Sequence, residues 1–335
     1  ANTIGEQNVA VGANALGKNT TANNNNAVGR YALYNNTTGV ENVAIGYLSL
    51  KTNTTGTSNV AIGSKSLEDN TTGGYNTVIG AEALNSNTTG ERIVAIGYGA
   101  LRNNTTGTQN VGIGLSALVA NTTGDYNTAV GSTALTSTTT AKYNTAFGYN
   151  ALANSNRTTD VNAYNTAVGY EAGDVITTGD KNVIIGSSSD PSANSGSNQI
   201  VIGHGATGHG DNIAVIGNGS ATAIHPHDNN EVDLGSTSYK YKNLFLTGSP
   251  IVGVSTITSS TTFNGSELII LANTSSASFT LTIDSDQLIN GRMLIIKKIG
   301  NNTLTLATEG SEKLNGGSTL DADTFTFGEH VGTAI

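Results

Sequence analysis

The sequence predicts an all-β fold: a repetitive parallel β-roll, or β-solenoid, of 17-residue repeats, followed by a neck and a small antiparallel β-module. Three observations predict it. A glycine recurs every 17 residues, a short apolar pattern precedes each of these glycines, and the period stops in the C-terminal part of the chain. A fixed period of this kind is typical of one supersecondary unit stacked on itself. The regular glycines are Gly12, Gly29, Gly46, Gly63, Gly80, Gly97, Gly114, Gly131 and Gly148.

Each of these glycines closes a phrase such as Asn42–Gly46, in which an apolar residue precedes the glycine and a β-branched residue usually stands two positions earlier. This alternation predicts a short strand with those two side chains on one face. The residue between them is normally alanine, and we expect this small face to be the surface where copies of the roll meet. A helix is excluded because β-branched residues, glycine and asparagine are concentrated in every period.

A turn of the type Asn-Thr-Thr-Gly follows in each repeat, clearest at Asn53–Gly56. Such residues supply the positive φ angles of tight corners. The Asn-Thr-Thr triplets also match N-glycosylation acceptors, but neighbouring coils are only about 4.8 Å apart, which leaves no room for stacked glycans. We therefore expect ladders of asparagine and threonine at the corners. The triplets begin at Asn19, Asn36, Asn53, Asn70, Asn87, Asn104 and Asn121.

The spacing of the glycines changes after the ninth repeat. It becomes 21 at Gly169, returns to 17 at Gly186 and Gly203, and shrinks to 14 at Gly217. The first change indicates an insertion around Ala153–Ala163, which we expect to loop out of one coil. Because the chain also opens inside a repeat, we expect further sequence before its first residue.

The thin repeat predicts an oligomer. One period offers only two or three large apolar side chains, and aromatic residues make up 5% of the chain. Ordering the backbone costs roughly 1–2 kcal/mol per residue, which so little burial hardly offsets. A second packing surface between copies would supply the missing burial. We therefore predict a parallel homotrimer, since three-fold symmetry is the natural closed form for a fibre.

The period divides the chain into three expected parts. Residues 1–219 form the β-roll, residues 220–257 the neck or linker, and residues 258–335 the C-terminal module. In the module, alternation of apolar residues with threonine predicts strands, as at Phe279, Leu281 and Ile283. Two segments between strands have the composition of hairpin turns, which predicts antiparallel pairing. These segments are Asn290-Gly291 and Gly300-Asn301-Asn302.

Composition narrows the classes of partner. The net charge is −9, with only 15 Lys and Arg, which argues against nucleic acid and anionic membranes. An 18-residue apolar run is absent, so we expect neither membrane insertion nor a signal peptide in this sequence. The lack of cysteine makes stability independent of redox conditions, which suits an extracellular particle.

Two sets of motifs carry a family resemblance. The phrases Asn42–Gly46 and Asn59–Gly63 resemble the head repeats of trimeric autotransporter adhesins of the YadA type, although those repeats are typically shorter. The 17-residue form with Asn-Thr-Thr-Gly is more similar to the repeat regions of phage tail fibre proteins. In addition, Glu231–Ser236 followed by Tyr241–Leu246 resembles the neck of many phage tail fibres. Together these motifs cover about two-thirds of the chain.

The resemblance implies a structural and adhesive homotrimer on the virion, extracellular, which attaches to the host by multivalent contacts. The implied partners are other tail or baseplate proteins and a glycan or protein receptor on the host surface. Three alternatives stay open. They are the head of a bacterial trimeric autotransporter-type adhesin on the cell surface, a cell-surface filament protein, and a monomeric ice-binding β-solenoid with a threonine array at Thr54-Thr55 and its equivalents.

One candidate metal site stands between the roll and the neck. In an extended segment, His225 and His227 face the same side, with Pro226 fixing the backbone between them. A three-fold axis would gather six such imidazoles into a cage for an octahedral transition metal. The alternative is a polar linker, and no other cofactor is expected.

A candidate glycan site consists of Tyr126, Tyr143 and Tyr164, each of which precedes a motif asparagine in successive coils. We expect them to form a ladder. Exposed stacked tyrosines bind sugar rings, and the alternative is packing between coils alone.

Catalysis is not expected. A glycan-cleaving enzyme needs two carboxylates about 5–9.5 Å apart, and pairs such as Glu68/Asp69 and Asp321/Asp323 have nothing to single them out. The sequence shows no Ser-His-Asp arrangement and no nucleotide-binding loop, because its glycines are corners.

Overall fold

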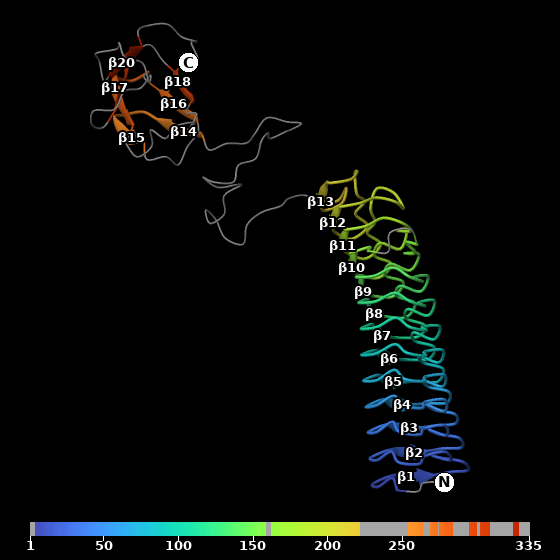
Figure 1. Ribbon diagram of the computed structural model, residues 1–335. Coiled ribbons are helices and arrows are strands. Elements are labelled where there is room, and N and C mark those ends of the chain that lie inside the picture. The colour runs from blue at the N-terminus through green and yellow to red at the C-terminus, as the bar shows by residue number, and fades with distance from the viewer. Residues whose placement is uncertain are drawn as a thin grey trace. The chain divides into compact units, whose positions relative to one another are not determined.

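The computed structural model describes residues 4–158, 162–221, 254–263, 269–273, 275–283, 295–299, 302–308 and 324–327. In these residues the protein is all-β (Figure 1). The chain forms two compact units, Ala1–His225 and Pro226–Ile335, each of which is described by itself. Within the described part of the chain, no helix has the length and apolarity needed to cross a membrane.

The first unit is a roll whose strands form one 13-stranded parallel sheet in chain order. Successive strands pair so that equivalent repeat positions lie opposite each other, as Val43 does to Val60 and Val60 to Thr77. The predicted parallel β-solenoid is thereby confirmed. Its strands are β1 Val9–Val11, β2 Asn26–Val28, β3 Val43–Ile45, β4 Val60–Ile62, β5 Thr77–Ile79, β6 Val94–Ile96, β7 Val111–Ile113, β8 Thr128–Val130, β9 Thr145–Phe147, β10 Thr166–Val168, β11 Val183–Ile185, β12 Ile200–Ile202 and β13 Ala214–Ile216.

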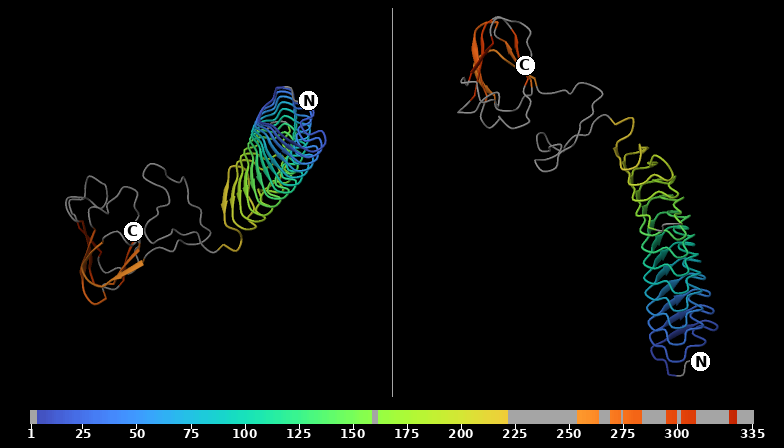
Figure 2. Two further views of the ribbon diagram at one scale, coloured as in Figure 1. Left: turned by 90° about the horizontal axis from the view of Figure 1, so that it is seen from below. Right: turned by 45° about the horizontal axis from the view of Figure 1, so that its top comes forward.

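Changes in repeat length do not interrupt this sheet. Thr145 of β9 lies opposite Thr166 of β10 across the 21-residue spacing, and Ile200 of β12 lies opposite Ala214 of β13 across the 14-residue one. The insertion predicted around Ala153–Ala163 is therefore taken up outside the strands. Two further views show the coils following one another without a break along the roll (Figure 2).

In β2–β12 the middle residue of the strand is buried, and its two neighbours, which are larger in most of these strands, face outward. Ala44 is fully buried, whereas Val43 is half-buried and Ile45 is 40% exposed. The expectation that the alanine face meets a neighbouring copy is therefore wrong. The space inside the coil next to the strand is limited. At the equivalent position of β7, a Cβ added to Gly112 would lie 3.0 Å from Cδ1 of Leu101 on the opposite wall. Next to a buried leucine only a small or medium side chain such as alanine or valine fits, whereas β11 has the larger Ile184 in its middle, where Gly173 stands eleven residues earlier in place of a leucine.

The corners use backbone conformations that few residues adopt. Gly46 has a φ of 138°, and a Cβ there would lie 2.3 Å from the carbonyl oxygen of Gly63 in the next coil. Leu50, four residues later, has a φ of 50°, which is uncommon for a bulky side chain. Because this leucine is fully buried, packing compensates for its backbone strain. The buried leucines of this row are Leu16, Leu33, Leu50, Leu67, Leu84, Leu101, Leu118, Leu135 and Leu152.

The predicted asparagine ladder is confirmed. Nδ2 of Asn53 donates to Oδ1 of Asn36 (2.9 Å) and to the carbonyl of Gly56 (3.0 Å). Asn70 donates in turn to Oδ1 of Asn53 (2.9 Å). All the asparagines of the Asn-Thr-Thr triplets are fully buried, so the folded roll offers none of them for glycosylation: Asn19, Asn36, Asn53, Asn70, Asn87, Asn104 and Asn121.

A second asparagine ladder lies just before the strands. The backbone N–H of Asn59 donates to Oδ1 of Asn42 (3.0 Å), and Nδ2 of Asn59 donates to the carbonyl of Gly73 (2.9 Å). Buried amides need such partners, because an unpaired one costs about 1–3 kcal/mol. The coil is therefore closed by hydrogen bonds as well as by its small apolar core.

The second unit contains two sheets, and the chain alternates between them. One sheet has the order β14-β16-β18 and the other β15-β17-β19-β20. All pairs are parallel except β19 with β20. The strands are β14 Val254–Ile257, β15 Thr261–Phe263, β16 Ile269–Asn273, β17 Phe279–Ile283, β18 Ile295–Ile299, β19 Leu304–Thr308 and β20 Thr324–Phe327.

The predicted antiparallel module is therefore wrong in its pairing, although its strands form where the alternation indicated. β17 and β18 lie in different sheets and do not form a hairpin. Parallel neighbours in one sheet need a connection that crosses over between them. Here that connection contains a strand of the other sheet, as β15 does between β14 and β16. Residues 290, 291, 300 and 301, expected in the hairpin turns, lie outside the described residues.

Candidate functional site

The predicted metal ligands His225 and His227 lie outside the described residues, as does the neck motif at Glu231–Leu246. The metal site therefore stays a prediction. Among the residues that the structure does describe, no group of three or more metal-binding side chains gathers in a suitable arrangement.

Tyr126, Tyr143 and Tyr164 form the predicted ladder. Each stands two residues before a strand (β8, β9 and β10), and we name the three together the entry column. The ring centroids of Tyr126 and Tyr143 are 5.1 Å apart with planes 9° from parallel, and those of Tyr143 and Tyr164 are 4.9 Å apart at 7°. Their exposed fractions are 46%, 38% and 48%, so the column is a surface feature.

The stacking decides which parts of the rings are accessible. Both faces of Tyr143 are covered by its two neighbours, and Tyr126 and Tyr164 each have one face covered. A sugar that binds aromatic side chains normally lies flat on a ring face. The column instead presents ring edges and hydroxyl groups, so glycan binding by these three residues stays a prediction with a restricted geometry.

An ion pair stands beside the entry column. Nζ of Lys142 lies 2.6 Å from Oδ2 of Asp125, and the backbone N–H of Thr108 donates to Oδ1 of the same carboxylate (2.8 Å). The hydrogen bond to Asp125 raises the pKa of Lys142, which burial only partly opposes. These contacts join neighbouring coils next to the tyrosine rings.

A second tyrosine pair lies on the other side of the same strands. Tyr149 and Tyr170 each stand two residues after a strand, β9 and β10, with centroids 5.3 Å apart and planes 14° from parallel. We name this pair the exit column. This pair is not among the residues expected from the sequence, although the repeated phrases Gly148-Tyr149 and Gly169-Tyr170 are a signal for it.

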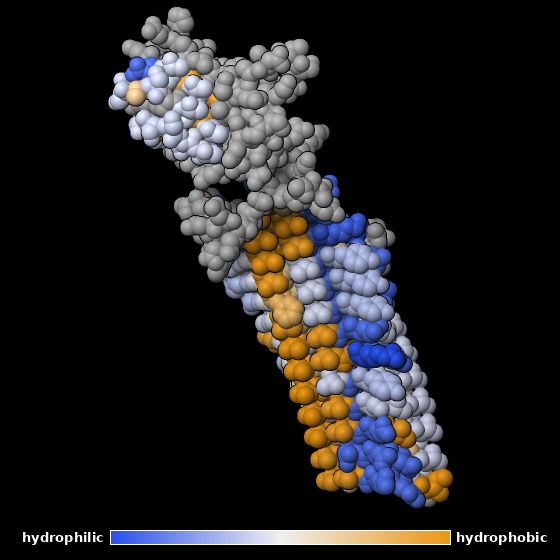
Figure 3. All heavy atoms as spheres, turned by 90° about the vertical axis from the view of Figure 1, so that its left-hand side faces the viewer, coloured by the Kyte–Doolittle hydropathy of each residue, from blue (hydrophilic) through white to orange (hydrophobic). Residues whose placement is uncertain are grey.

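An aliphatic stripe, formed by the apolar ones among the outward side chains of β1–β13, runs along the roll and passes between the two columns at β8–β10. Figure 3 shows apolar residues gathered along this face of the roll. At about 4.8 Å per strand, the 13 strands give a stripe roughly 60 Å long. Contiguous apolar patches of several hundred Å² are typical of interaction surfaces. Its most exposed members are Val9, Val11, Val28, Ile45, Ile79, Phe147, Val168, Ile185, Ile200 and Ile216.

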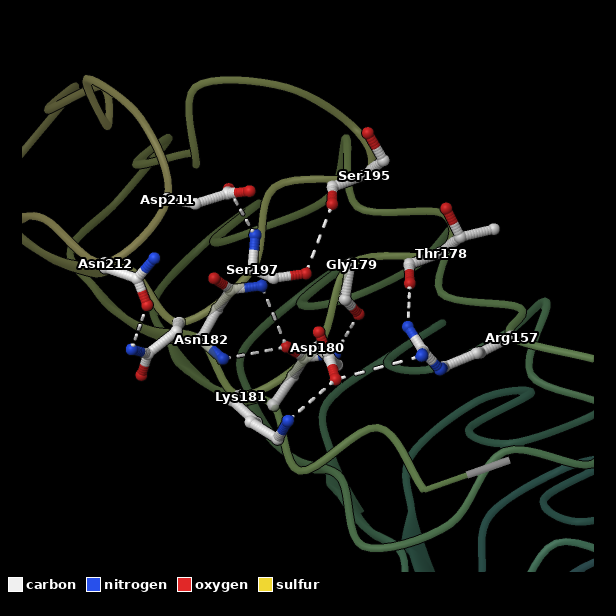
Figure 4. Close-up of polar contacts among 12 residues, drawn as sticks. Arg157, Thr178, Gly179, Asp180, Lys181, Asn182, Ser195, Ser197, Asp211 and Asn212 are labelled. Atoms are coloured by element: carbon white, nitrogen blue, oxygen red, sulfur yellow. Dashed lines mark hydrogen bonds and ion pairs between the residues drawn. The ribbon is translucent and has the colours of Figure 1, made fainter. Parts of the chain in front are cut away.

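A polar cluster joins the last coils, where the repeat is irregular (Figure 4). Oδ2 of Asp180 lies 3.8 Å from Nη2 of Arg157 and 3.4 Å from Nζ of Lys181. Burial alone would raise the pKa of Asp180, but the hydrogen bond from Ser197 and the two cations outweigh it and lower the pKa. Asp211 accepts a hydrogen bond from the backbone N–H of Ser197 (2.8 Å). The cluster thus stabilises coils that lack the full asparagine ladder.

Asp190 is under electrostatic strain nearby. Its Oδ1 is buried without a hydrogen-bond partner. Burial, helped by the charges of Asp174 and Glu171, raises the pKa of Asp190 to about 6. Burial also raises the pKa of Asp174. The sequence alone could not indicate this cluster, because the coils bring together residues that are far apart in the chain.

The chain was compared with models of known protein families and with curated protein sequences, and neither comparison finds a match.

Proposed function

We propose that the chain is a segment of a homotrimeric adhesive fibre, of the kind found in phage tails. In this proposal the roll is a rigid spacer, and the fibre attaches to a receptor on a host cell surface. The observation that carries the proposal is the aliphatic stripe, because a roll in water leaves a continuous apolar face unburied unless something covers it.

A parallel ring of copies is the partner that best fits this stripe. The stripe repeats at every coil, and so does the stripe of a second copy aligned in parallel, so the two match along their whole length. Closed cyclic symmetry buries such a face in every copy at once. Three copies per fibre then turn weak receptor contacts into strong attachment through effective concentration.

The hydrogen bonding of the coils supports the role of a spacer. Neighbouring coils are bonded through the strand ladder and, over most of the roll, through the asparagine ladders and the threonine turn, where Oγ1 of Thr54 donates to the carbonyl of Thr71 (3.0 Å). Continuous bonding between coils makes a rod stiff along its axis. A stiff rod holds a distal module away from the particle that carries it.

The same threonine contact bears on the ice-binding alternative. Ice binding needs a flat array of free hydroxyl groups at regular spacing. Thr54, Thr71, Thr88 and their equivalents use their hydroxyls to bond the next coil. This leaves the row of exposed threonines such as Thr55 and Thr89, one per turn, and we rank ice binding below the fibre.

Adhesion to cells tests the proposal. The fluorescently labelled chain is titrated onto a panel of bacterial cells, next to two variants with equal charge change, Ile79→Lys in the stripe and Thr89→Lys on the exposed turn. We expect saturable binding by the wild type and by Thr89→Lys. For Ile79→Lys we expect at least a hundredfold weaker binding, because its assembly is lost. Equal binding by both variants, or a monomeric wild type, would contradict the proposal.

A further inference from the structure

Tyrosines gather in three neighbouring coils of the roll, on both sides of the stripe. The entry column stands where β8, β9 and β10 begin, and the exit column stands where β9 and β10 end. Between them the outward residue at the end of β9 is Phe147, 43% exposed, where most coils carry valine or isoleucine. No other level of the described roll has stacked tyrosines on both sides.

We propose that the exit column of one copy packs against the entry column of the next copy, and that this aromatic seam restricts the axial register of the assembly to two neighbouring alignments. The partner is a second copy of this chain. The inference rests on the parallel ring proposed above and adds to it the residues that align the copies.

Rotational symmetry brings the two columns together. When parallel copies turn their stripes toward a common axis, the side where strands end in one copy faces the side where strands begin in the next. Tyr143 and Tyr149 flank β9, and Tyr164 and Tyr170 flank β10, so both columns stand at the same levels of the roll. A slip of one coil in one direction still leaves Tyr149 and Tyr170 opposite entry rings, and the closed ring, which has no axial offset between copies, decides between these two alignments.

A repetitive interface needs such a device. Because the stripe carries valine or isoleucine at nearly every level, two copies can slip past each other by one coil, about 4.8 Å, with little loss of apolar contact. The exit positions next to the column are Ser132 and Ser187, and the entry positions next to it are Gln109 and Lys181. A longer slip therefore replaces ring contacts with contacts to these residues.

The exposure of the rings agrees with an interface. Tyr149 is 46% exposed and Tyr170 is 52% exposed, although large aromatic side chains are normally mostly covered. Aromatic residues are enriched at the cores of protein interfaces, where the ring packs and the hydroxyl finds a partner. Because stacking covers the ring faces of the entry column, its outward edges fit another row of side chains better than they fit a flat sugar.

Cross-linking tests the seam directly, since the chain has no cysteine. The variant Tyr143→Cys/Tyr149→Cys places one thiol on each side of β9. The two positions are separated by six residues of mainly extended chain, roughly 15–20 Å, so a short thiol-specific cross-linker cannot join them within one copy. We expect it to join neighbouring copies and to yield a covalent ring of three on a denaturing gel. The mismatched variant Tyr143→Cys/Tyr47→Cys, with its second thiol six coils lower, should give no ring.

A second pair of variants measures the energetic role of the seam. The variant Tyr149→Ser/Tyr170→Ser introduces serine, which already occupies the equivalent position in the adjacent coils as Ser132 and Ser187, so the coil keeps its fold. We expect the assembly to dissociate at a concentration at least tenfold higher than the wild type. The control Tyr47→Ser/Tyr98→Ser makes the same change on the same side outside the seam and should have a much smaller effect.

The outcomes separate the two proposals. A three-copy mass with no cross-linked ring and unchanged dissociation overturns the seam and leaves the fibre proposal intact. Unchanged dissociation together with lost cell adhesion in Tyr149→Ser/Tyr170→Ser overturns the seam and assigns these tyrosines to receptor contact. A single-copy mass for the wild type overturns the assembly and the seam with it.

Discussion

At the scale of the residue, the corner glycines carry the tightest constraint. Gly80 has a φ of 140°, and a Cβ there would lie 2.4 Å from the carbonyl oxygen of Gly97. Alanine would strain its own backbone and push on the next coil at once. We expect Gly80→Ala to lower the free energy of unfolding by about 2–4 kcal/mol, measured by urea unfolding followed by circular dichroism.

Gly99 provides the matched control for this change. Its φ is 63°, and the nearest atom to an added Cβ is Oγ of Ser116 at 3.7 Å. Gly99→Ala should cost only about 1 kcal/mol, the ordinary cost of left-handed backbone. Equal losses for the two variants would show that the close approach between coils does not decide the stability of the corner.

The asparagine ladder makes a second prediction. Asn70→Ala removes the donor to Oδ1 of Asn53 and the acceptor for Nδ2 of Asn87, both buried. We expect a loss of about 2–5 kcal/mol in the free energy of unfolding, because buried polar groups are left unpaired. The neighbouring Asp69→Ala, at an exposed position, should stay within about 0.5 kcal/mol of the wild type. A small loss in Asn70→Ala would mean that water replaces the ladder.

Asp190 gives stability a defined pH dependence. Its pKa in the folded protein, about 6, lies above the unfolded value of about 4. The folded state therefore holds this proton more tightly, so the contribution of Asp190 is most favourable below about pH 4 and is lost as the pH rises to about 6. We expect Asp190→Asn to stabilise the roll by about 1–2 kcal/mol at pH 7 and hardly at all near pH 4. The stabilisation is measured as the difference in unfolding midpoint between variant and wild type at about pH 4 and about pH 7. The same difference at both pH values would refute the prediction.

At the scale of the element, the coil that contains β10 fills its core from a different position than the other coils do. Coil β10 has Gly173 where the preceding coils have leucine, and the fully buried Ile176 where most of them have the ladder asparagine. A Cβ on Gly173 would lie 3.2 Å from Cδ1 of Ile176 and 3.2 Å from Cδ2 of Leu152. The isoleucine therefore fills the space that a leucine occupies elsewhere.

A double-mutant cycle tests this exchange. Gly173→Leu alone should overpack the coil by about 1–3 kcal/mol, and Ile176→Asn alone should leave a cavity and cost about 2–5 kcal/mol. The double variant restores the regular pattern, so we expect its loss to be at least about 1 kcal/mol smaller than the sum of the two. Additive losses in denaturant unfolding would show that the two side chains do not share one space.

The position of every roll strand could be predicted from the sequence, because glycine corners and alternation recur at a fixed distance. The direction of the side chains could not. Alternation distinguishes the face with Val43 and Ile45 from the face with Ala44, but it does not say which one is the core. The larger residues are the natural choice for the core, but the row of buried leucines already fills most of it and leaves room mainly for alanine at the middle of each strand.

The pairing in the second unit was missed for a related reason. Strands such as β17 and β19 follow from alternation, whereas their partners depend on how the chain returns, which no local pattern records. The entry column was predictable because one residue type repeats at a fixed place. The clusters around Asp180 and Asp190 were not, since their members come from different coils with irregular spacing.

At the scale of the whole molecule, the roll is closed inside and apolar on one outer face. The Leu and Ala rows and the asparagine ladders fill the interior. The side chains of the stripe are thus not part of the core of one copy, and for this reason we assign them to the contact between copies. The burial between copies that was expected at the alanine faces is available between these stripes instead.

The solution mass of this chain, measured by light scattering or sedimentation without denaturant, tests the account most directly. One copy has a mass of 34.1 kDa. We expect three times that value, about 102 kDa, held over a wide range of protein concentration. A stable mass of 34.1 kDa with the roll folded would contradict the account, because the stripe would then remain in water without a partner.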